Sequence, residues 1–423
     1  MSRGWLLALV VLIVGAGGTW LGVRAFAKAL DPIRVGLLHS QSGPLAISEA
    51  SMVDAEVLAL EQLNAQGGIL GRRIEWVIAD GRSDPATFAR EAERLIASEK
   101  VTVIFGCWTS ACRKSVMPVV ERTNHLLVYP VAYEGMEASP NIIYTGAAPN
   151  QQIIPTVKWS WDILKAKSYF LIGTDSIWPR SANEIVKDQL KALGATLLGE
   201  EYLSTKGGGL DAALEKAIKA QPDVILSTIE GDANLPFYQK IRAPGGPGLK
   251  IPVITFPVTE EELRELPVKE MVNDYAVCNY FQSIDRPENI AFVKAFKTRF
   301  GQDRVTSDAI DTAYNSVKLW AQAVAEADTS SVQEVYKSMQ RQSLNAAEGV
   351  ISIDRETKHT WRPFFVGRIR GDGQVEIIWT IEKPIKPMPF PFSRTKLEWG
   401  EFIDSLYTGW GGNWSAPLTD KAR

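Results

Sequence analysis

The sequence predicts an α/β protein whose parallel sheets are covered by helices. From Ile33 onward, short apolar strands alternate with amphipathic helices, and this alternation is typical of parallel sheets. The composition agrees, because 45% hydrophobic and 22% charged residues are ordinary for a globular chain. With 423 residues, the chain has room for two or three domains.

The individual elements follow from local patterns. Strands are expected where short apolar runs end in polar residues, and helices where apolar residues recur at helical spacing. Asp84-Pro85 marks one helix start. In order, we expect a strand at 33–40, a helix at 47–65, strands at 72–80, 101–106 and 125–130 separated by a helix at 84–99, a helix at 152–164, a strand at 168–175, a helix at 182–194, a strand at 195–203, a helix at 210–221, and strands at 223–231 and 251–256.

Two turn-rich stretches divide this pattern, at 144–152 and 276–283. After the second, long amphipathic helices are expected at 288–301 and 308–327, followed by β-like sequence from 349 to 382. Residues 386–423 are proline-rich and then aromatic. We interpret this C-terminal tail as a strap that lies on the body of the protein.

The N-terminal segment, residues 1–30, has the features of an export signal. Arg3 precedes an apolar run from Trp5 to Val23, and Ala25-Phe26-Ala27 provides the small residues that a signal peptidase accepts. The run is also nearly long enough to span a bilayer. The segment therefore predicts an exported protein, either periplasmic after cleavage or held by an N-terminal membrane anchor.

Charge and metal-binding residues exclude several classes. The chain has 46 basic and 49 acidic side chains, so its formal net charge of −3 gives no reason to expect a nucleic-acid partner. Its cysteines and histidines number three each and lack metal-site spacing. We therefore expect no metal and no cofactor, and we interpret the cysteines as buried or inert thiols.

The common catalytic motifs are also absent, including G-x-S-x-G, H-E-x-x-H and the P-loop. Cys107 and His125 are a conceivable nucleophile and base, which would make the protein a cysteine-dependent amide hydrolase. The simpler interpretation is that Cys107 ends a strand, His125 lies in a loop, and Arg113-Lys114 face solvent. We do not expect an enzyme.

Binding residues are expected where the strands end, because ligands of open α/β sheets lie beyond the carboxyl ends of the strands. Several such ends carry aromatic, hydroxyl or acidic groups. A hydroxyl at the start of a helix, as at Ser110, is suited to donate to a ligand oxygen. The strand-end candidates are Trp108, Thr109, Ser110, Tyr129, Tyr133, Ser176, Trp178, Glu230 and Asp232.

The stretch 106–135, "GCWTSACRKSVMPVVERTNHLLVYPVAYEG", resembles the urea and short-chain-amide binding proteins, a branch of the branched-chain amino-acid type periplasmic binding proteins. Further matching stretches bring the resemblance to roughly residues 33–385. They are "NAQGGILGRRIE", "NIIYTGAAPNQQ", "TDSIWPRSANEI", "GDANLPFY", "NYFQSID", "DRVTSDAIDTAYNSVKLWAQAV" and "EGVISIDRETKHTWRP".

This resemblance implies a type I periplasmic-binding-protein fold, with two Rossmann-like lobes, three crossovers and a ligand cleft that closes about a hinge. Lobe 1 would comprise 31–146 and 281–349, and lobe 2 would comprise 147–280 and 350–385. The implied role is the substrate-binding component of an ABC transporter, which captures urea or another small neutral amide and delivers it to a membrane permease.

The resemblance also ranks the site residues. Trp108, Ser110, Tyr129 and Trp178 fall where the family contacts its ligand, with Ser110 bonding the carbonyl oxygen. Thr109, Tyr133 and Glu230 rank second. Ser176, Trp178 and Glu230 depart from the family pattern, which leaves an amino acid open as the ligand. A sensor that signals to a regulator or membrane kinase is the alternative function.

Overall fold

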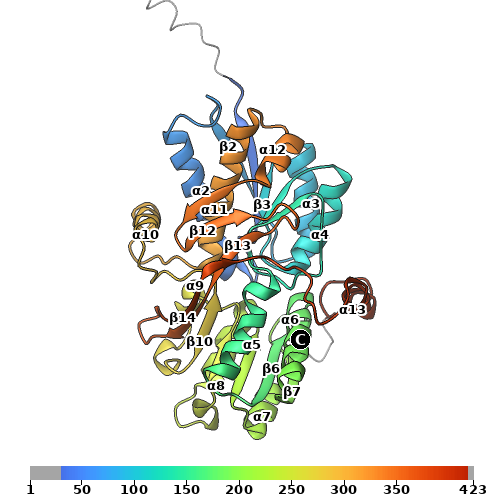
Figure 1. Cartoon of the computed structure of the whole chain (residues 1–423), viewed down its shortest axis with the longest axis vertical. Helices are drawn as coiled ribbons and strands as arrows, with labels where there is room; N and C mark the ends of the chain where they lie inside the picture. The colour runs from blue at the N-terminus through green and yellow to red at the C-terminus, as the bar shows by residue number, and fades with distance from the viewer. Residues whose placement is uncertain (1–29, 418–423) are drawn as a thin grey trace, which may run out of the picture.

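The computed structural model describes residues 30–417, which form two lobes stacked one above the other (Figure 1). The first lobe, uppermost in the figure, contains a five-stranded parallel sheet in the order β2-β1-β3-β4-β5. Its strands are β1 (Ile33–His39), β2 (Ile74–Asp80), β3 (Ile104–Gly106), β4 (Leu127–Tyr129) and β5 (Ile142–Tyr144). Its helices are α2 (Ala46–Ala65), α3 (Pro85–Ala97), α4 (Ser110–Arg122), α10 (Pro287–Phe300), α11 (Asp308–Ala327) and α12 (Val332–Met339).

The second lobe is built on five parallel strands that pair in the order β7-β6-β8-β9-β10. These strands are β6 (Ser168–Thr174), β7 (Thr196–Leu203), β8 (Val224–Thr228), β9 (Val253–Thr255) and β10 (Tyr275–Cys278). The accompanying helices are α5 (Ile153–Asp162), α6 (Ile177–Leu193), α7 (Leu210–Ala220), α8 (Asn234–Ile241) and α9 (Glu260–Leu263).

Antiparallel strands extend this second sheet. They are β11 (Ser343–Ala346), β12 (Gly349–Ile353), β13 (Thr360–Ile369) and β14 (Val375–Ile385). The first residues of β13 pair with β12, and its later residues pair with β10 and β14. Near the start of β13, the carbonyl of Lys358 accepts a hydrogen bond from the N–H of Tyr144 in β5, at 2.9 Å. The strand β13 therefore runs from the first lobe into the second.

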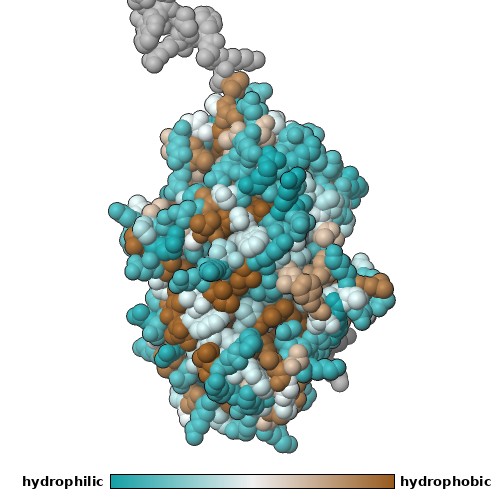
Figure 2. Space-filling view, in the orientation of Figure 1, coloured by the Kyte–Doolittle hydropathy of each residue, from teal (hydrophilic) through white to brown (hydrophobic). Residues whose placement is uncertain are grey.

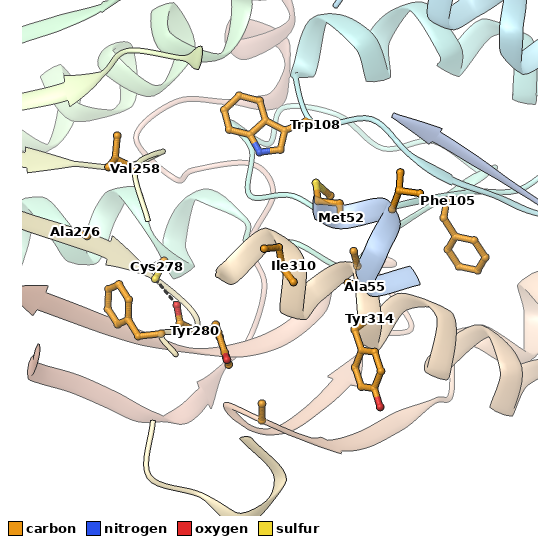
Figure 3. Close-up of a cluster of buried hydrophobic side chains, with 14 of the residues drawn as sticks. Met52, Ala55, Phe105, Trp108, Val258, Ala276, Cys278, Tyr280, Ile310 and Tyr314 are labelled. Atoms are coloured by element: carbon orange, nitrogen blue, oxygen red, sulfur yellow. Dashed lines mark hydrogen bonds between the residues drawn. The ribbon is translucent and has the colours of Figure 1, made fainter. Parts of the chain in front are cut away.

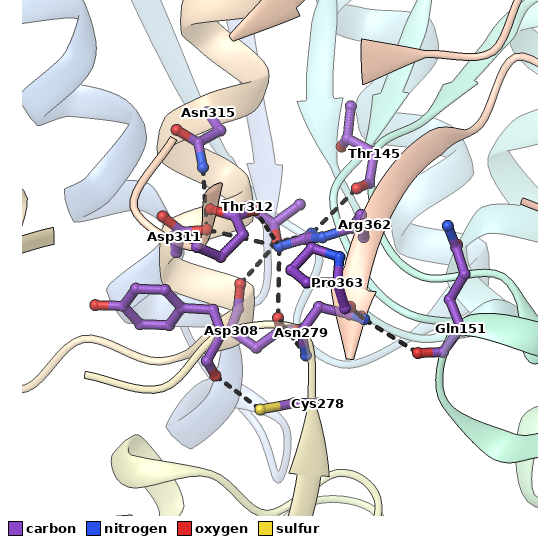
Figure 4. A network of polar contacts seen from close by, with 12 residues as sticks. Thr145, Gln151, Cys278, Asn279, Asp308, Asp311, Thr312, Asn315, Arg362 and Pro363 are labelled. Carbon is purple, nitrogen blue, oxygen red and sulfur yellow. Dashed lines mark hydrogen bonds and ion pairs between the residues drawn. The ribbon is translucent and has the colours of Figure 1, made fainter. Parts of the chain in front are cut away.

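Three chain crossovers meet between the lobes and are hydrogen-bonded to one another (Figure 4). The side-chain amide of Asn279, in the second crossover, donates to the carbonyl of Gln151 in the first, at 3.1 Å, and to that of Pro363 in the third. Arg362 donates to the carbonyl of Thr145 at 3.2 Å. The fold is the predicted type I periplasmic-binding-protein fold, and these contacts define its hinge.

A buried apolar cluster continues across the hinge. Figure 3 shows Met52, Trp108 and Ile310 from the first lobe in the same cluster as Val258 and Cys278 from the second. On the face shown in Figure 2, hydrophobic residues also gather around the middle of the molecule, where the lobes join. The two lobes are therefore packed against each other and not merely linked by three segments.

Local chemistry explains most element boundaries. Asp84 is the N-cap of α3, accepting from the N–H of Thr87 at 2.8 Å, and Pro85 occupies the first helical position. Helix α6 begins at Ile177, five residues before the predicted start at 182. Pro179 is tolerated in its first turn because the N–H groups there have no partner within the helix.

The C-terminal tail lies on the body, and it contains the helix α13 (Lys396–Gly409), which packs beside α6 (Figure 1). The carbonyl of Pro389 accepts from the N–H of Met136 at 2.7 Å, and Arg394 pairs with Glu184 and Asp188 of α6. Near the end of the tail, Ser415 forms an antiparallel bridge with Ser176. The tail therefore contacts both lobes.

The expected signal peptide or membrane anchor, residues 1–30, lies outside the described residues except for Leu30. Between residues 30 and 417, no helix is both long enough and apolar enough to cross a membrane.

Candidate ligand-binding cleft

The loop between β3 and α4 carries three of the predicted site residues, Trp108, Thr109 and Ser110. A disulfide between Cys107 and Cys112 closes this loop, with the two Cα atoms 5.7 Å apart. Thr109 is the N-cap of α4, because its Oγ1 accepts a hydrogen bond from the N–H of Cys112 at 3.0 Å. The loop is thus held at both ends.

The cysteines were predicted to be buried or inert thiols; all three are buried, but the disulfide shows that Cys107 and Cys112 are not free thiols. Cys107 precedes helix α4, which begins at Ser110, and its φ of 67° lies in the left-handed region, in the turn between β3 and α4. Cys107 therefore offers no free thiol for a hydrolase. His125, its proposed partner, bonds the carbonyl of Val101 at 2.8 Å instead. Only Cys278 matches the prediction, as a free and buried thiol.

A small cavity lies between the lobes, and we call it the central cavity. The volume open to the centre of a water-sized sphere is about 50 Å³. Four of the predicted site residues line it, and further residues come from both lobes and from the hinge. The lining residues are Trp108, Ser110, Val131, Ala132, Gln152, Trp178, Glu230, Phe256, Pro257, Thr259, Glu262, Cys278, Asp308 and Ala309.

Ser110 reaches this cavity with a hydroxyl group that is already bonded. Its Oγ donates to the carboxylate of Glu134 and accepts from Arg113 Nη1 at 3.0 Å. The predicted role of Ser110, donating to a ligand carbonyl, therefore does not fit this arrangement, because its single proton points to Glu134. The hydroxyl retains a lone pair, so it can accept a hydrogen bond from a ligand N–H.

Arg113 and Lys114 do not face solvent as predicted, because both are buried. Arg113 pairs with Glu134 at 3.0 Å and with Glu137 at 2.9 Å, and Lys114 pairs with Glu137 at 3.0 Å. Although burial alone would raise it, these two cations hold the pKa of Glu137 below its ordinary value. The charged network supports the wall of the cleft from behind.

Tyr129 and Tyr133 belong to this supporting layer and do not line the central cavity. The hydroxyl of Tyr129 donates to the carbonyl of Trp108 at 2.8 Å. Tyr133 stacks on Tyr144 with a centroid distance of 5.2 Å, and its hydroxyl contacts His359 at 2.5 Å. Both tyrosines are fully buried; Tyr129 holds the loop that carries Trp108 and Ser110, and Tyr133 packs edge-on against Tyr129 with a centroid distance of 5.9 Å.

Glu230 supplies the central acidic group on the second lobe. It follows β8, and its carboxylate Oε2 accepts a hydrogen bond from the Ser176 hydroxyl. Its own N–H donates to Thr174 Oγ1 at 2.9 Å. Burial raises the pKa of Glu230 to about 7, and the charge of Glu134 across the cleft adds to this shift. A carboxyl oxygen accepts more than one hydrogen bond, so Glu230 can also receive ligand N–H groups.

Trp178 lies in the first turn of α6 on the second lobe, and it lines the central cavity together with Trp108 of the first lobe. Its side chain is buried, and its indole Nε1–H has no hydrogen-bond partner among the described residues. A buried donor of this kind costs free energy unless it finds an acceptor. Trp178 also lines the central cavity, so an oxygen atom of a bound ligand is a candidate acceptor for this N–H.

Sequence reasoning missed several lining residues. Phe256 follows β9 and could have been found by the strand-end rule that identified Glu230. Glu262 lies within α9, Asp308 is the first residue of α11, and Gln152 lies in the first crossover. No local sequence pattern marks these three positions as part of a binding site. Burial raises the pKa of both Glu262 and Asp308. The described residues contain no group of three or more His, Cys, Asp and Glu side chains suited to a metal ion.

Comparisons with known proteins agree with this geometry. Residues 33–396 match the periplasmic binding protein domain family. A Leu/Ile/Val-binding protein homolog from Brucella suis is 26% identical over 343 residues, covering 74% of this chain and 81% of that protein. A limonene hydroxylase from Geobacillus stearothermophilus is 30% identical over only 121 residues, so the chain covers 22% of that relative's length.

Solved structures give the same fold at low identity. A solute-binding protein of an ABC transporter from R. palustris, in complex with benzoate, matches with a TM-score of 0.76 at 19% identity, over 84% of this chain and 98% of that chain. A leucine-binding protein from Thermotoga maritima matches with a TM-score of 0.72 at 17% identity, over 82% and 98%. The chain belongs to the periplasmic binding protein family, and it is a solute-binding protein rather than an enzyme.

Proposed function

We propose that this protein captures urea or a short-chain amide in the central cavity and delivers it to the membrane permease of an ABC transporter. The family implies an exported, periplasmic location for this task. One observation carries the choice of ligand: the same cavity is lined by Trp178, whose indole N–H has no partner among the described residues, and by Glu230, which has a buried carboxyl group. An amide offers one carbonyl acceptor and its N–H donors, which are the complements of these two groups.

The size of the cavity supports a ligand with few atoms. About 50 Å³ is open to the centre of a water-sized sphere, compared with the 10–15 Å³ or so that a single water needs. A ligand this small has few contacts, so its affinity depends on complete burial and a full set of hydrogen bonds. The faces of Trp108 and Trp178 supply flat apolar surface for a planar amide.

The charge of the lining supports a neutral ligand over an acid. Among the described residues that line the central cavity, Glu230, Glu262 and Asp308 are acidic and none is Lys, Arg or His. A carboxylate ligand, such as the benzoate bound to the relative from R. palustris, would face these acids without a basic partner. An amino acid would satisfy Glu230 with its ammonium group, so leucine is the comparison ligand that matters most.

Trp178→Phe tests the proposal, because phenylalanine keeps an aromatic face but removes the N–H donor. Leaving the carbonyl of a buried amide unpaired costs about 1–3 kcal/mol, so we expect affinity for urea or acetamide to fall by roughly 5- to 150-fold. Isothermal titration calorimetry of the wild type and the variant against urea, acetamide, leucine and benzoate measures this.

Trp159→Phe is the matched control, since Trp159 is also a buried tryptophan of the second lobe with an unpartnered indole N–H but does not line the cavity. The control should bind like the wild type. Tight binding of leucine or benzoate with no measurable binding of urea or amides would refute the proposed ligand class. Equal affinities in wild type and Trp178→Phe would remove the indole N–H from the site.

A further inference from the structure

A second and larger cavity lies against the central one, and we call it the mouth cavity. The volume open to the centre of a water-sized sphere is about 380 Å³, compared with about 50 Å³ in the central cavity. Glu230 lines both cavities, so the two adjoin at this residue, whose carboxyl group we assign to ligand N–H groups. Urea alone would leave most of the mouth cavity unfilled, and the volume of this cavity falls in the range of ordinary ligand pockets.

The mouth cavity is walled by three parts of the chain that are far apart in sequence. The first lobe contributes Leu45, Phe88 and Ala111, the second contributes Ser176 and Glu230, and the C-terminal tail contributes Ser415. Ser415 is held there by its antiparallel bridge to Ser176, whose hydroxyl bonds Glu230. The tail therefore forms part of the wall that leads to the carboxyl group of Glu230.

Most polar side chains in this cavity are already bonded within the protein. Ser83 donates to the carbonyl of Ser42 at 3.0 Å and accepts from the N–H of Leu45 at 3.1 Å. Asp84 caps α3, and Thr109 caps α4. What these groups leave for a ligand is apolar surface, chiefly the buried ring of Phe88 and the half-buried Leu45.

Charge at the opening is balanced. Asp84 and Lys206 are exposed and carry opposite charges, and the third ionisable residue of the lining, Glu230, is bonded to Ser176. The ligand part that fits this cavity is therefore apolar and uncharged.

We infer that the mouth cavity is a second subsite, which takes an apolar substituent of the same amide or urea whose polar head binds between Trp178 and Glu230. The preferred ligands are then substituted ureas or longer amides with an aliphatic or aromatic group of about four or more carbons. This inference rests on the proposed function, because it assumes that an amide head occupies the central cavity.

Titration of the wild type with urea, N-methylurea and N-butylurea tests the subsite. Each buried methylene contributes up to about 0.8 kcal/mol, so N-butylurea should bind at least tenfold more tightly than urea. Leu45→Ala should reduce the affinity for N-butylurea at least threefold and leave that for urea unchanged. Leu198→Ala, which makes the same change on β7 outside both cavities, is the matched control and should alter neither affinity.

The outcomes separate the two proposals. Urea binding with no gain for N-butylurea would overturn the subsite while leaving the proposed function intact. An equal loss of both ligands in Leu45→Ala would also overturn it, because a subsite residue should affect only the substituent. If neither compound binds the folded wild type, the proposed function fails and the subsite fails with it.

Discussion

At the scale of single residues, the cleft depends on a carboxyl group whose environment favours its neutral form. Glu230 is buried between the lobes, and burial raises its pKa from 4.5 to about 7. Between these two values the folded state holds a proton that the unfolded state releases. The contribution of Glu230 to the free energy of unfolding therefore falls as the pH rises from about 5 to about 7.

Glu230→Gln should remove this pH dependence, because glutamine keeps an acceptor for Ser176 but never ionises. At pH 5 the variant and the wild type should have similar stability, and at pH 8 the variant should be more stable by about 1–3 kcal/mol. Thermal denaturation of both proteins between pH 4 and pH 9 measures the difference. Glu215→Gln, on the exposed face of α7, is the control and should show no such divergence.

If Glu230→Gln were less stable than the wild type at pH 8, ionisation of the buried Glu230 carboxyl group would not destabilise the folded state. The raised pKa of Glu230 would then be wrong. The same variant should bind urea more weakly at pH 8, since a charged carboxylate accepts N–H bonds more strongly than an amide oxygen.

The sequence predicted which residue types reach the cleft better than it predicted their roles. Strand-end reasoning identified Trp108, Ser110, Trp178 and Glu230, because parallel strands bring their carboxyl ends to one edge. It could not show that the proton of Ser110 points to Glu134, since that contact joins residues 24 positions apart. Tyr129 and Tyr133 looked like pocket residues for the same reason, although Tyr129 supports the loop from behind and Tyr133 bonds His359.

At the scale of elements, the loop from Cys107 to Cys112 is the most constrained part of the site. The disulfide closes it at its base, Thr109 caps the following helix, and Tyr129 bonds the carbonyl of Trp108. Within this loop, Trp108 and Ser110 are the residues that line the central cavity. The disulfide therefore helps to position two residues that line the central cavity.

Replacing both cysteines, Cys107→Ser with Cys112→Ser, should weaken binding of urea or amide severalfold, because the loop must then be ordered when the ligand binds. Calorimetric titration in the oxidised state measures the loss. Addition of dithiothreitol should weaken binding by the wild type to the same degree and leave the double variant unaffected. Undiminished affinity in both cases would show that Thr109 and Tyr129 hold the loop without the disulfide.

Most elements could be predicted because local patterns determine them, as with the Asp84-Pro85 start of α3. Two features of the structure were not predicted from these local patterns, the helix of the C-terminal tail and the disulfide. The strap was predicted without its helix α13, although the capping pair Thr395 and Glu398 is visible in the sequence as a start signal. The disulfide was missed because the strand-to-helix turn at Cys107 that brings the two cysteines together is not a sequence pattern.

At the scale of the whole molecule, the two lobes touch at the rim of the cleft as well as at the hinge. Ser48 and Ser51, on α2 of the first lobe, donate to Glu262 and Glu261 of α9 on the second lobe, each at 2.7 Å. All four residues are buried, and the N–H of Asp232 reaches the carbonyl of Pro44 nearby, at 3.3 Å. These contacts belong to a closed arrangement, since opening about the hinge would separate α2 from α9.

Ser48→Ala with Ser51→Ala should therefore weaken ligand binding, although neither serine lines the central cavity. The two hydrogen bonds favour the closed state by about 1–2 kcal/mol together. Because apparent affinity falls with the fraction of molecules that can close, we expect a loss of roughly 5- to 30-fold. Titration calorimetry measures the affinity, and small-angle X-ray scattering measures the radius of gyration of the unliganded protein, which should increase in the variant.

Ser405→Ala, on the exposed face of α13, controls for the loss of a serine hydroxyl and should change neither quantity. A saturating ligand should restore the compact radius in the double variant, because a ligand that binds only the closed state shifts the population toward it. An unchanged radius together with reduced affinity would place the effect in the cavity itself, through Glu262, and not in closure. The scattering measurement thus decides whether α2 and α9 act as a latch between lobes or only as part of the ligand site.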